Sequence, residues 1–182
     1  LSNGLTKIGD SAFSDCKNLT EITIPDSVIS IDGSAFSGCK SLTEITVSPD
    51  NKNYVSVDGV LFTKNMSTLV AYPAGNERST YTIPYGGKKI CAFAYCENLP
   101  LEELPANLRE IGNHAFSCCR NLQLEELPEG LEIIGDRAFF SCVNLRLVAL
   151  PANLREINNG TFDHCRNLRL EELPEGLTRI DN

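Results

Sequence analysis

The sequence predicts a mainly β solenoid built from stacked coils of about 23 residues. A phenylalanine followed three residues later by a cysteine recurs along the chain, with the phenylalanines at positions 13, 36, 93, 116, 139 and 162. Four of the five intervals are 23 residues long, and the fifth is 57 residues long. A fixed interval of this size is typical of stacked repeats, in which each unit buries the apolar surface of the next. We therefore expect a single array over residues 1–182 that belongs to a longer parent protein.

Residues 19–31 illustrate the content of one coil. Leu19, Ile22 and Ile24 have the Leu-x-x-Leu-x-Leu spacing of a leucine-rich repeat, and residues 20–24 alternate like a β-branched strand. Pro25 has no amide proton for a strand ladder and ends this strand. Residues 28–31 predict a second short strand on the opposite face. The Ala-Phe-x-x-Cys segment is too short for a regular helix and predicts a turn or one 3₁₀ turn.

A small or polar residue stands four positions before each repeat phenylalanine except Phe93. These residues are Gly9, Asp32, Gly112, Gly135 and Asn158, with Asp181 where a further copy would continue. Glycine, asparagine and aspartate tolerate a left-handed backbone. We expect a corner with positive φ at this position of each coil.

The interval of 57 residues contains an inserted β-hairpin element, which we assign to residues 49–80. Asp58-Gly59 lies between two β-prone runs, a strong hairpin signal. A second turn over residues 64–67 precedes another β-prone run, so two or three antiparallel strands are expected. The insertion also carries an aromatic cluster that includes Tyr54, Phe62 and Tyr72. These aromatic residues either pack the hairpin on the array or form an exposed binding patch.

The second half of the chain departs from the strand pattern of the first. Glu102, Glu125 and Glu171 occupy the repeat position of Ile22, and the leucines at 101, 124 and 170 stand one residue earlier. An ionised glutamate cannot face the core unpaired without a large desolvation cost. The pattern therefore predicts a local register change that turns the leucine inward and both glutamates of each pair toward water.

Eight cysteines in a short chain suggest a disulfide scaffold, but their positions argue against one. Six of them follow the repeat phenylalanines and should stack as a reduced ladder of small buried side chains. Cys91 and Cys118 are additional. Oxidation of the Cys91–Cys96 or Cys118–Cys119 pair stays open, although packing without a disulfide is the favoured interpretation.

Charge and composition narrow the classes of partner. The formal net charge is −8 and the isoelectric point is about 4.8, which argues against a nucleic acid or an anionic membrane surface as partner. No apolar run approaches the length of a membrane span. His114 and His164 stand near cysteines, but paired Cys-x-x-Cys spacing is absent and no residue set converges as catalysis requires. We therefore predict no enzyme activity, no catalytic residues, no metal site and no cofactor.

The candidate partner-binding residues lie on the predicted concave strand face. They are Glu21, Thr23, Glu44, Thr46, Glu103, Glu126 and Glu172. The glutamates of successive coils should form a column that attracts a basic partner. The alternative is a solvated surface whose charge is partly balanced by Arg109, Arg155 and Arg179, since isolated surface charge pairs contribute little.

The repeated phrase Ile-Pro-x-x-Val-x-x-Ile-Gly-x-x-Ala-Phe-x-x-Cys-x-x-Leu resembles the BspA-like class of bacterial leucine-rich repeats. Residues 54–75 resemble an element that is often set among such repeats. The resemblance implies a curved, right-handed solenoid on a secreted or cell-surface protein that attaches to host proteins, matrix proteins or other cells. It favours an extracellular, non-enzymatic adhesion module, and the alternative is a structural spacer that presents another domain of the parent.

Overall fold

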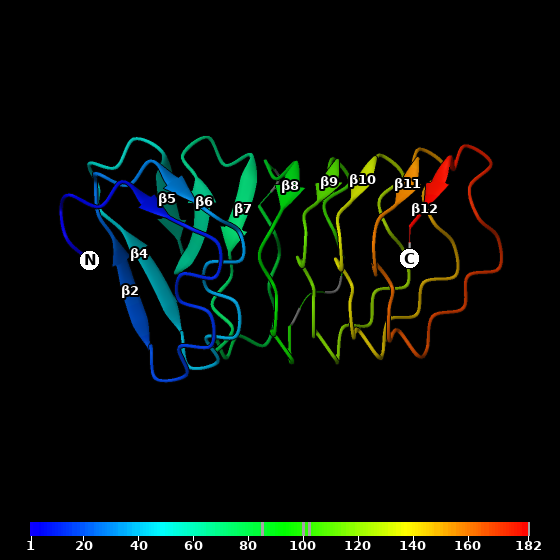
Figure 1. Ribbon diagram of the computed structural model, residues 1–182, viewed down its shortest axis with the longest axis horizontal. Helices are drawn as coiled ribbons and strands as arrows, with labels where there is room; N and C mark the ends of the chain where they lie inside the picture. The colour runs from blue at the N-terminus through cyan, green and yellow to red at the C-terminus, as the bar shows by residue number, and fades with distance from the viewer. Residues whose placement is uncertain (85, 100, 102, 182) are drawn as a thin grey trace.

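In the computed structural model the chain is a stack of coils with short strands on two faces (Figure 1). The structure describes residues 1–84, 86–99, 101 and 103–181. One face carries β2 (Glu21–Ile24) and β4 (Glu44–Val47). The opposite face carries two-residue strands, namely β1 (Lys7–Ile8), β3 (Ser30–Ile31), β8 (Lys89–Ile90), β9 (Glu110–Ile111), β10 (Ile133–Ile134), β11 (Glu156–Ile157) and β12 (Arg179–Ile180). The predicted mainly β repeat solenoid with strands on both faces is confirmed, and the described residues contain no helix.

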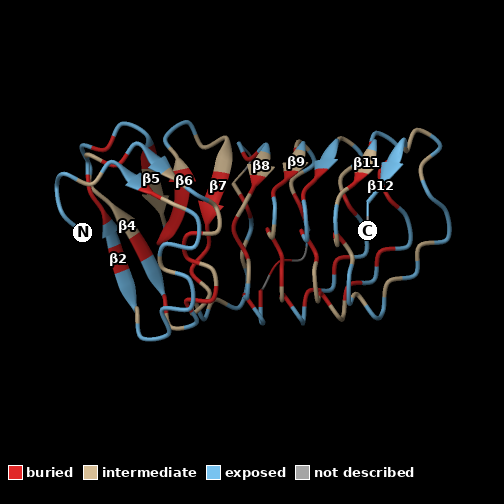
Figure 2. Ribbon diagram, viewed as in Figure 1, coloured by how far each residue is buried: buried red, intermediate tan, exposed pale blue. Residues whose placement is uncertain are grey.

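Strand pairing follows the repeat interval. β2 and β4 are parallel, and Glu21 is opposite Glu44, 23 residues later. β8 to β12 pair in parallel in chain order. Exposed residues gather in the loops at the two margins of the array, and buried residues line the walls between them (Figure 2). Each coil therefore closes around a narrow interior that the neighbouring coils cover.

A stack of phenylalanine rings fills this interior. The ring centroids of Phe93, Phe116, Phe139 and Phe162 are 5.1, 5.2 and 5.7 Å apart in succession, and the rings are nearly parallel. Phe13 stacks on Phe36 in the same way at 5.5 Å. These spacings match the distance expected for favourable aromatic pairs. The equal spacing of the phenylalanines thus corresponds to aligned rings in two stacks, Phe13 on Phe36 and Phe93 to Phe162. We call these two stacks the aromatic spine.

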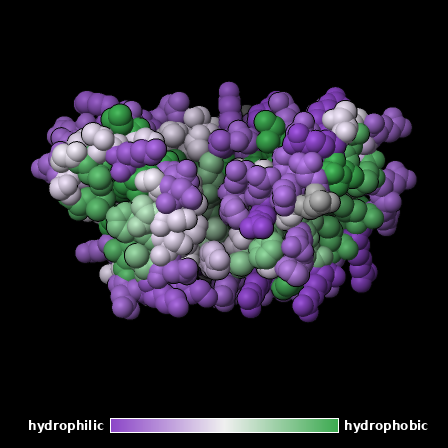
Figure 3. All heavy atoms as spheres, in the orientation of Figure 1, coloured by the Kyte–Doolittle hydropathy of each residue, from purple (hydrophilic) through white to green (hydrophobic). Residues whose placement is uncertain are grey.

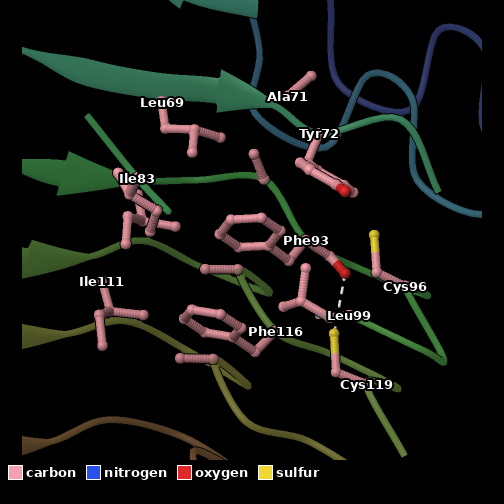
Figure 4. Packing of buried hydrophobic residues seen from close by; sticks show 14 of the residues in the cluster. Leu69, Ala71, Tyr72, Ile83, Phe93, Cys96, Leu99, Ile111, Phe116 and Cys119 are labelled. Atoms are coloured by element: carbon pink, nitrogen blue, oxygen red, sulfur yellow. Dashed lines mark hydrogen bonds between the residues drawn. The ribbon is translucent and has the colours of Figure 1, made fainter. Parts of the chain in front are cut away.

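A cysteine ladder runs beside the rings. The thiol of Cys119 donates a hydrogen bond to the carbonyl oxygen of Phe93 in the preceding coil, at 2.9 Å (Figure 4). Cys39, Cys142 and Cys165 make the equivalent bond to Phe13, Phe116 and Phe139 at 2.9 to 3.0 Å. All eight cysteines are free. The thiols of these four cysteines therefore bond carbonyl groups of the preceding coil. The prediction of buried thiols is confirmed for Cys39, Cys96, Cys119 and Cys142, whereas Cys165 is half-buried and the prediction is wrong for Cys16, which is exposed.

An asparagine ladder lies on the outside of the same turns. Asn121 donates to Asn98 at 2.9 Å, Asn144 donates to Asn121 at 3.3 Å, and Asn167 donates to Asn144 at 3.2 Å. An amide side chain can donate and accept at once, so asparagine can occupy this position in each coil of the ladder. The ladder connects the last four coils at one margin of the array.

The insertion supplies its own element of the aromatic spine. β5 (Tyr54–Val57), β6 (Val60–Thr63) and β7 (Thr68–Ala71) form an antiparallel meander, and β7 joins the β8 edge in parallel. Ala71-Tyr72 then aligns with Ala92-Phe93, and the Tyr72 ring lies 5.2 Å from the Phe93 ring. The tyrosine thus takes the place of the repeat phenylalanine in the coil that the insertion forms.

The coils flanking the insertion still meet at one margin. Lys40 and Glu97 occupy the same repeat position on either side of the interval of 57 residues, and their charged groups are 2.8 Å apart. Gly75 passes so close to the backbone of Lys40 and Ser41 that a Cβ atom there would lie 2.7 and 2.8 Å from backbone atoms. The insertion therefore requires glycine where it passes between the coils.

Positive φ angles occur at a different place from the one predicted. Gly112 and Gly135 do not adopt positive φ, whereas the residue two positions after each repeat phenylalanine does, as at Cys118 (φ 61°) and Ser141 (φ 57°). The prediction of a left-handed corner at Gly9, Asp32, Gly112, Gly135, Asn158 and Asp181 is wrong. Close approach of coils requires glycine at Gly135 and makes the contact tight at Gly112. A Cβ atom on Gly135 would lie 2.6 Å from the Asn113 amide nitrogen, and one on Gly112 would lie 3.1 Å from the Cys91 sulfur.

The turn after each phenylalanine is a single hydrogen-bonded turn. The Cys16 amide donates to the Phe13 carbonyl at 3.2 Å, and the Cys119 amide donates to the Phe116 carbonyl at 3.0 Å. The described residues contain turns at these places and no 3₁₀ helix. The short turn is sufficient because the thiol of the next coil satisfies the phenylalanine carbonyl from the other side.

The predicted register change is present in the second half. Leu101 and Leu124 are buried and Leu170 is half-buried, whereas Glu103, Glu125, Glu126, Glu171 and Glu172 are exposed. Glu102, which belongs to the same pattern, lies outside the described residues. The described parts of segments 99–104, 122–127, 145–150 and 168–173 form no strands. Two inward residues separated by two outward residues break the alternation that a strand requires.

Candidate protein-binding surface

The solvent side of β2 and β4 brings four predicted residues together. Glu21, Thr23 and Glu44 are exposed and Thr46 is half-buried, while Ile22, Ile24 and Ile45 point inward. The hydroxyl groups of Thr23 and Thr46 are 2.8 Å apart and share a hydrogen bond. We call this surface, together with the outward residues at 103, 123, 125, 126, 146, 148, 149, 169, 171 and 172 of the later coils, the β2–β4 face.

The remaining three predicted residues lie farther along the same face. Glu103, Glu126 and Glu172 are exposed and occupy the repeat position of Thr23 in later coils. The β5–β6 hairpin separates them from β4. The Ile45 amide donates to the Gly59 carbonyl at 2.9 Å, and the Ser56 hydroxyl donates to the Ile45 carbonyl at 2.5 Å. The candidate residues are therefore divided into a group of four and a group of three by the hairpin.

A shallow hollow lies where β4 meets the hairpin. Its volume is about 640 Å³, and its lining includes Thr43, Glu44, Thr46, Ser56, Asp58, Asn76 and Arg78. The Arg78 guanidinium donates to the Asp58 carbonyl at 2.5 Å and so fixes the hairpin tip beside Glu44. Sequence reasoning missed Arg78 because the loop that carries it shows no periodic signal.

A second hollow lies on the later coils and has a volume of about 490 Å³. It is lined by Glu125, Glu126, Arg146, Val148, Asn167 and Arg169. Val148 is 50% exposed. Val148-Ala149 stands in the sequence where the neighbouring coils have a glutamate pair, and the structure makes Val148 part of this hollow.

The opposite face neutralises its own charges. Lys89 and Glu110 on neighbouring strands are 2.6 Å apart, and Glu156 and Arg179 are 2.8 Å apart. Arg109 lies 3.6 Å from Glu132. Arg109 and Arg179 therefore form their ion pairs on the opposite face. Neither forms an ion pair with Glu103, Glu126 or Glu172. The expectation that these arginines balance the acidic column is wrong for Arg109 and Arg179. The Arg155 side chain donates a hydrogen bond to the Gly176 carbonyl at 3.2 Å.

The predicted aromatic patch on the insertion is not exposed. Tyr54, Phe62 and Tyr72 are 7%, 1% and 5% exposed. The Tyr54 hydroxyl accepts a hydrogen bond from the Ile31 amide at 2.8 Å, so the ring packs against the second coil. Burial also raises the pKa of Tyr72 to about 12. The alternative in which these rings pack the hairpin on the array is the one that the structure supports, because the meander has no other apolar surface to cover.

Four of the thiols are made poor nucleophiles by burial. Burial raises the pKa of Cys91 to about 11 and that of Cys165 to about 11, and it also raises the pKa of Cys119 and Cys142. The reactive form of cysteine is the thiolate. These groups therefore stay protonated at neutral pH and act as packing and hydrogen-bonding groups.

His164, one of the two histidines, contacts Asp163 and Phe140. His164 is exposed and its Nδ1 lies 3.7 Å from an Asp163 oxygen, while its ring contacts Phe140 edge to face. Across residues 1–84, 86–99, 101 and 103–181, no three side chains of His, Cys, Asp and Glu are placed to hold a metal ion. Within the same residues no helix is long and apolar enough to span a membrane.

The repeat geometry is matched by a sequence family. The family described as BspA type leucine rich repeat region matches residues 1–73 and 79–182 in six copies. The chain belongs to this family of BspA-type leucine-rich repeats. The predicted resemblance is thereby confirmed for almost the entire array. Comparison with curated protein sequences gives no significant match.

Solved structures of bacterial leucine-rich repeat proteins share the fold. The pneumococcal vaccine antigen PcpA superposes with a TM-score of 0.72 at 24% identity over 97% of this chain and 48% of its own. A leucine rich cell surface protein from Faecalibacterium prausnitzii A2-165 has a TM-score of 0.65 at 26% identity over 100% of this chain and 58% of its own. A leucine-rich repeat protein from Eubacterium ventriosum has a TM-score of 0.57 at 24% identity, over 100% and 62%. This BspA-type array thus spans about half the length of these proteins.

Proposed function

We propose that this BspA-type array is a non-enzymatic, extracellular protein-binding module that attaches its parent protein to host, matrix or cell-surface proteins through the β2–β4 face. The observation that carries the proposal is the difference in charge pairing between the two faces. The described ion pairs between coils lie on the opposite face and at the Lys40–Glu97 margin. Glu21, Glu44, Glu103, Glu126 and Glu172 on the β2–β4 face have no such partner among the described residues.

Rigidity supports the same function. Stacked rings and hydrogen bonds between coils hold the β2–β4 face in a fixed arrangement, so a partner loses little free energy to ordering this surface. Unpaired acidic groups attract a basic partner and speed its association, and this attraction weakens as salt is added. The similarity to a protein described as a cell surface protein favours an extracellular site of action.

Charge-reversal variants test the proposal. Binding of the purified array to immobilised extracellular-matrix proteins and to fixed host cells would be measured by biolayer interferometry and flow cytometry. One variant carries Glu21→Lys and Glu44→Lys, and a second carries Glu103→Lys and Glu172→Lys. The control carries Glu129→Lys and Glu175→Lys, two exposed loop residues with the same change in charge.

We expect either face variant to weaken binding at least tenfold, while the control changes it by less than about twofold. Equal effects of all three variants would contradict a role for the β2–β4 face. Absence of binding by the array, together with loss of adhesion by the parent only when coils are deleted, would instead support a structural spacer.

A further inference from the structure

The coil at residues 145–150 differs from its two neighbours at one point of the β2–β4 face. Val148-Ala149 stands where the preceding coil has Glu125-Glu126 and the following coil has Glu171-Glu172. Val148 is 50% exposed, although most valines in the array are buried or half-buried. The result is a small apolar site with carboxylates on the coils to both sides.

The charges around this site are not paired with one another. Glu125, Glu126, Arg146 and Arg169 line the hollow around Val148 with Asn167, and none of them forms an ion pair within the described part of the chain. The carboxylates on either side of Val148 are two coils apart, roughly 10 Å at the usual spacing of adjacent strands. Two glutamates and two arginines line the hollow, so it offers carboxylates to an external cation and guanidinium donors to external carbonyl groups.

We propose that this hollow binds an extended polypeptide segment in which a small apolar side chain is flanked on both sides by lysine or arginine. The inference rests on the proposed function, because it names the chemistry of the partner on the same face. Val148 contacts the apolar side chain, and the carboxylates of the two neighbouring coils bind the flanking cations.

The geometry of an extended segment fits the site. Alternate side chains of a strand point the same way and are roughly 7 Å apart, so residues two positions before and after the apolar one face the array with it. The long stems of lysine and arginine reach over the remaining distance. Arg146, Arg169 and Asn167 are hydrogen-bond donors that can bind backbone carbonyl oxygens of the segment, which have no other partner in an isolated strand.

Other ligand classes fit less well. Nucleic acid fits less well because the lining has no surplus of basic residues and the whole chain has a net charge of −8. The described lining residues include no aromatic side chain, so a flat ring or sugar has no stacking platform. A polypeptide uses all three features of the hollow, namely its carboxylates, its donors and its exposed valine.

A pair of peptides tests the proposal directly. The probe is a fluorescently labelled peptide Lys-Thr-Val-Thr-Lys with blocked ends, and the matched probe has serine in place of valine. Dissociation constants would be measured by fluorescence anisotropy and NMR titration at about 0.05 M and about 0.5 M NaCl. We expect the valine peptide to bind the natural array at least threefold more tightly than the serine peptide at low salt.

Two variants separate the apolar contact from the charge contact. Val148→Glu reproduces the residue that both neighbouring coils already carry, so the coil keeps its fold. It should abolish the preference for valine while keeping salt-dependent attraction to both peptides. The double variant Glu125→Gln and Glu171→Gln should weaken the binding of both peptides at least fivefold and reduce the dependence of their dissociation constants on salt. Glu129→Gln with Glu175→Gln is the control for the same loss of charge.

The outcomes distinguish this inference from the proposed function. Equal binding of the two peptides to the natural array, or equal effects of the double variant and its control, would overturn the inference. If the array still binds its protein partners and the Glu21→Lys and Glu44→Lys variant weakens that binding, the proposed function stands without this site. Folding of every variant is checked by circular dichroism and by NMR.

Discussion

The first two coils and the last four coils bury the same kind of interior, but their backbones differ on the β2–β4 face. In the first, Glu-Ile-Thr-Ile and Glu-Ile-Thr-Val alternate outward and inward residues and form the paired strands β2 and β4. In the last four, the Leu-x-Leu-x-x-Leu pattern turns three apolar residues inward without regular alternation, except in the terminal coil, where Leu173 is 50% exposed. The described residues form no strand there. Both regions nevertheless keep the same rings, thiols and repeat interval in the interior.

The difference indicates that the interior, and not the sheet on the β2–β4 face, sets the register of the array. Phe93, Phe116 and Phe139 are fully buried, as are Cys119 and Cys142. The later coils are joined on the β2–β4 face by isolated backbone hydrogen bonds, such as that from the Arg146 amide to the Leu124 carbonyl at 3.2 Å. The β2–β4 face can therefore change in sequence while the stack stays in place.

The largest expected effect tests the aromatic spine. Phe116→Ala removes a fully buried ring that stacks on both neighbours and should cost about 4 kcal/mol of unfolding free energy. Phe13→Ala removes a half-buried ring with a single stacking partner and should cost about 2 kcal/mol. Urea denaturation followed by circular dichroism measures both. Equal costs would show that the two regions do not depend on the spine to different degrees.

The next effect tests the register change at a shared repeat position. Leu124→Ala should cost about 3 kcal/mol because the leucine is buried. Glu21→Ala, at the equivalent position in the first coil, should change stability by less than about 0.5 kcal/mol because the glutamate is exposed.

A swap of two residues tests whether the later coils can adopt the earlier pattern. Leu124→Glu alone buries a charge, whereas Leu124→Glu combined with Glu125→Ile recreates the order found at Glu21-Ile22. We expect the combined variant to recover at least half of the stability lost by Leu124→Glu, measured as a double-mutant cycle. No recovery would mean that neighbouring coils impose the leucine pattern.

These comparisons also show how far sequence reasoning reaches. The spine, the thiol ladder and the outward glutamates follow from one rule, that residues at the same repeat position share one environment. The prediction of a left-handed corner at Gly112 and Gly135 was wrong because glycine occurs both where φ is positive and where coils approach closely. The sequence does not show which of these two reasons applies. Distances between coils were needed to decide.

The candidate site was less predictable than the fold. The exposure of Glu21 and Glu126 follows from alternation and from the cost of burying charge. The burial of Tyr54, Phe62 and Tyr72 depends on how the insertion docks on the array, and no periodic signal in residues 49–80 specifies that docking. Arg78 and the hollow around Val148 depend on neighbours that are distant in the sequence.

The free energy of unfolding should also depend on pH, and the cysteines of the two regions should contribute differently to that dependence. Burial raises the pKa of Cys119 and Cys142 above the ordinary value of 9.0, whereas Cys16 in the first coil is exposed. Above about pH 9 the unfolded chain releases these protons and the folded chain keeps them, so stability falls as pH rises, by about 1.4 kcal/mol per pH unit for each thiol. Below about pH 9 neither state releases them and this term is constant.

Cysteine variants isolate this term. The free energy of unfolding, measured from about pH 8 to about pH 11, should fall less steeply in Cys142→Ala than in the natural chain. The difference in slope should correspond to about one proton fewer released on unfolding. Cys16→Ala should leave the slope unchanged. Native-state alkylation should follow the same order, with Cys16 reacting long before Cys119. Rapid alkylation of Cys119 in the folded protein would contradict the buried ladder.

The smallest expected effect concerns the asparagine ladder. Asn121→Ala breaks two side-chain hydrogen bonds between exposed amides and should cost about 0.5 to 1 kcal/mol. Asn18→Ala, in the first coil, should cost less because Ser41 stands at the next repeat position and offers no amide for a ladder. Thermal unfolding of the two variants makes the comparison.

Tyr72 has a wider consequence for how such proteins change in length. Because the inserted element ends in its own alanine and aromatic residue, the unit downstream meets a surface much like the one that an ordinary unit would present. Duplication or loss of units beyond that junction leaves the junction itself intact. The element thus behaves as an adapter, across which evolution or a protein engineer can exchange modules without redesigning either side.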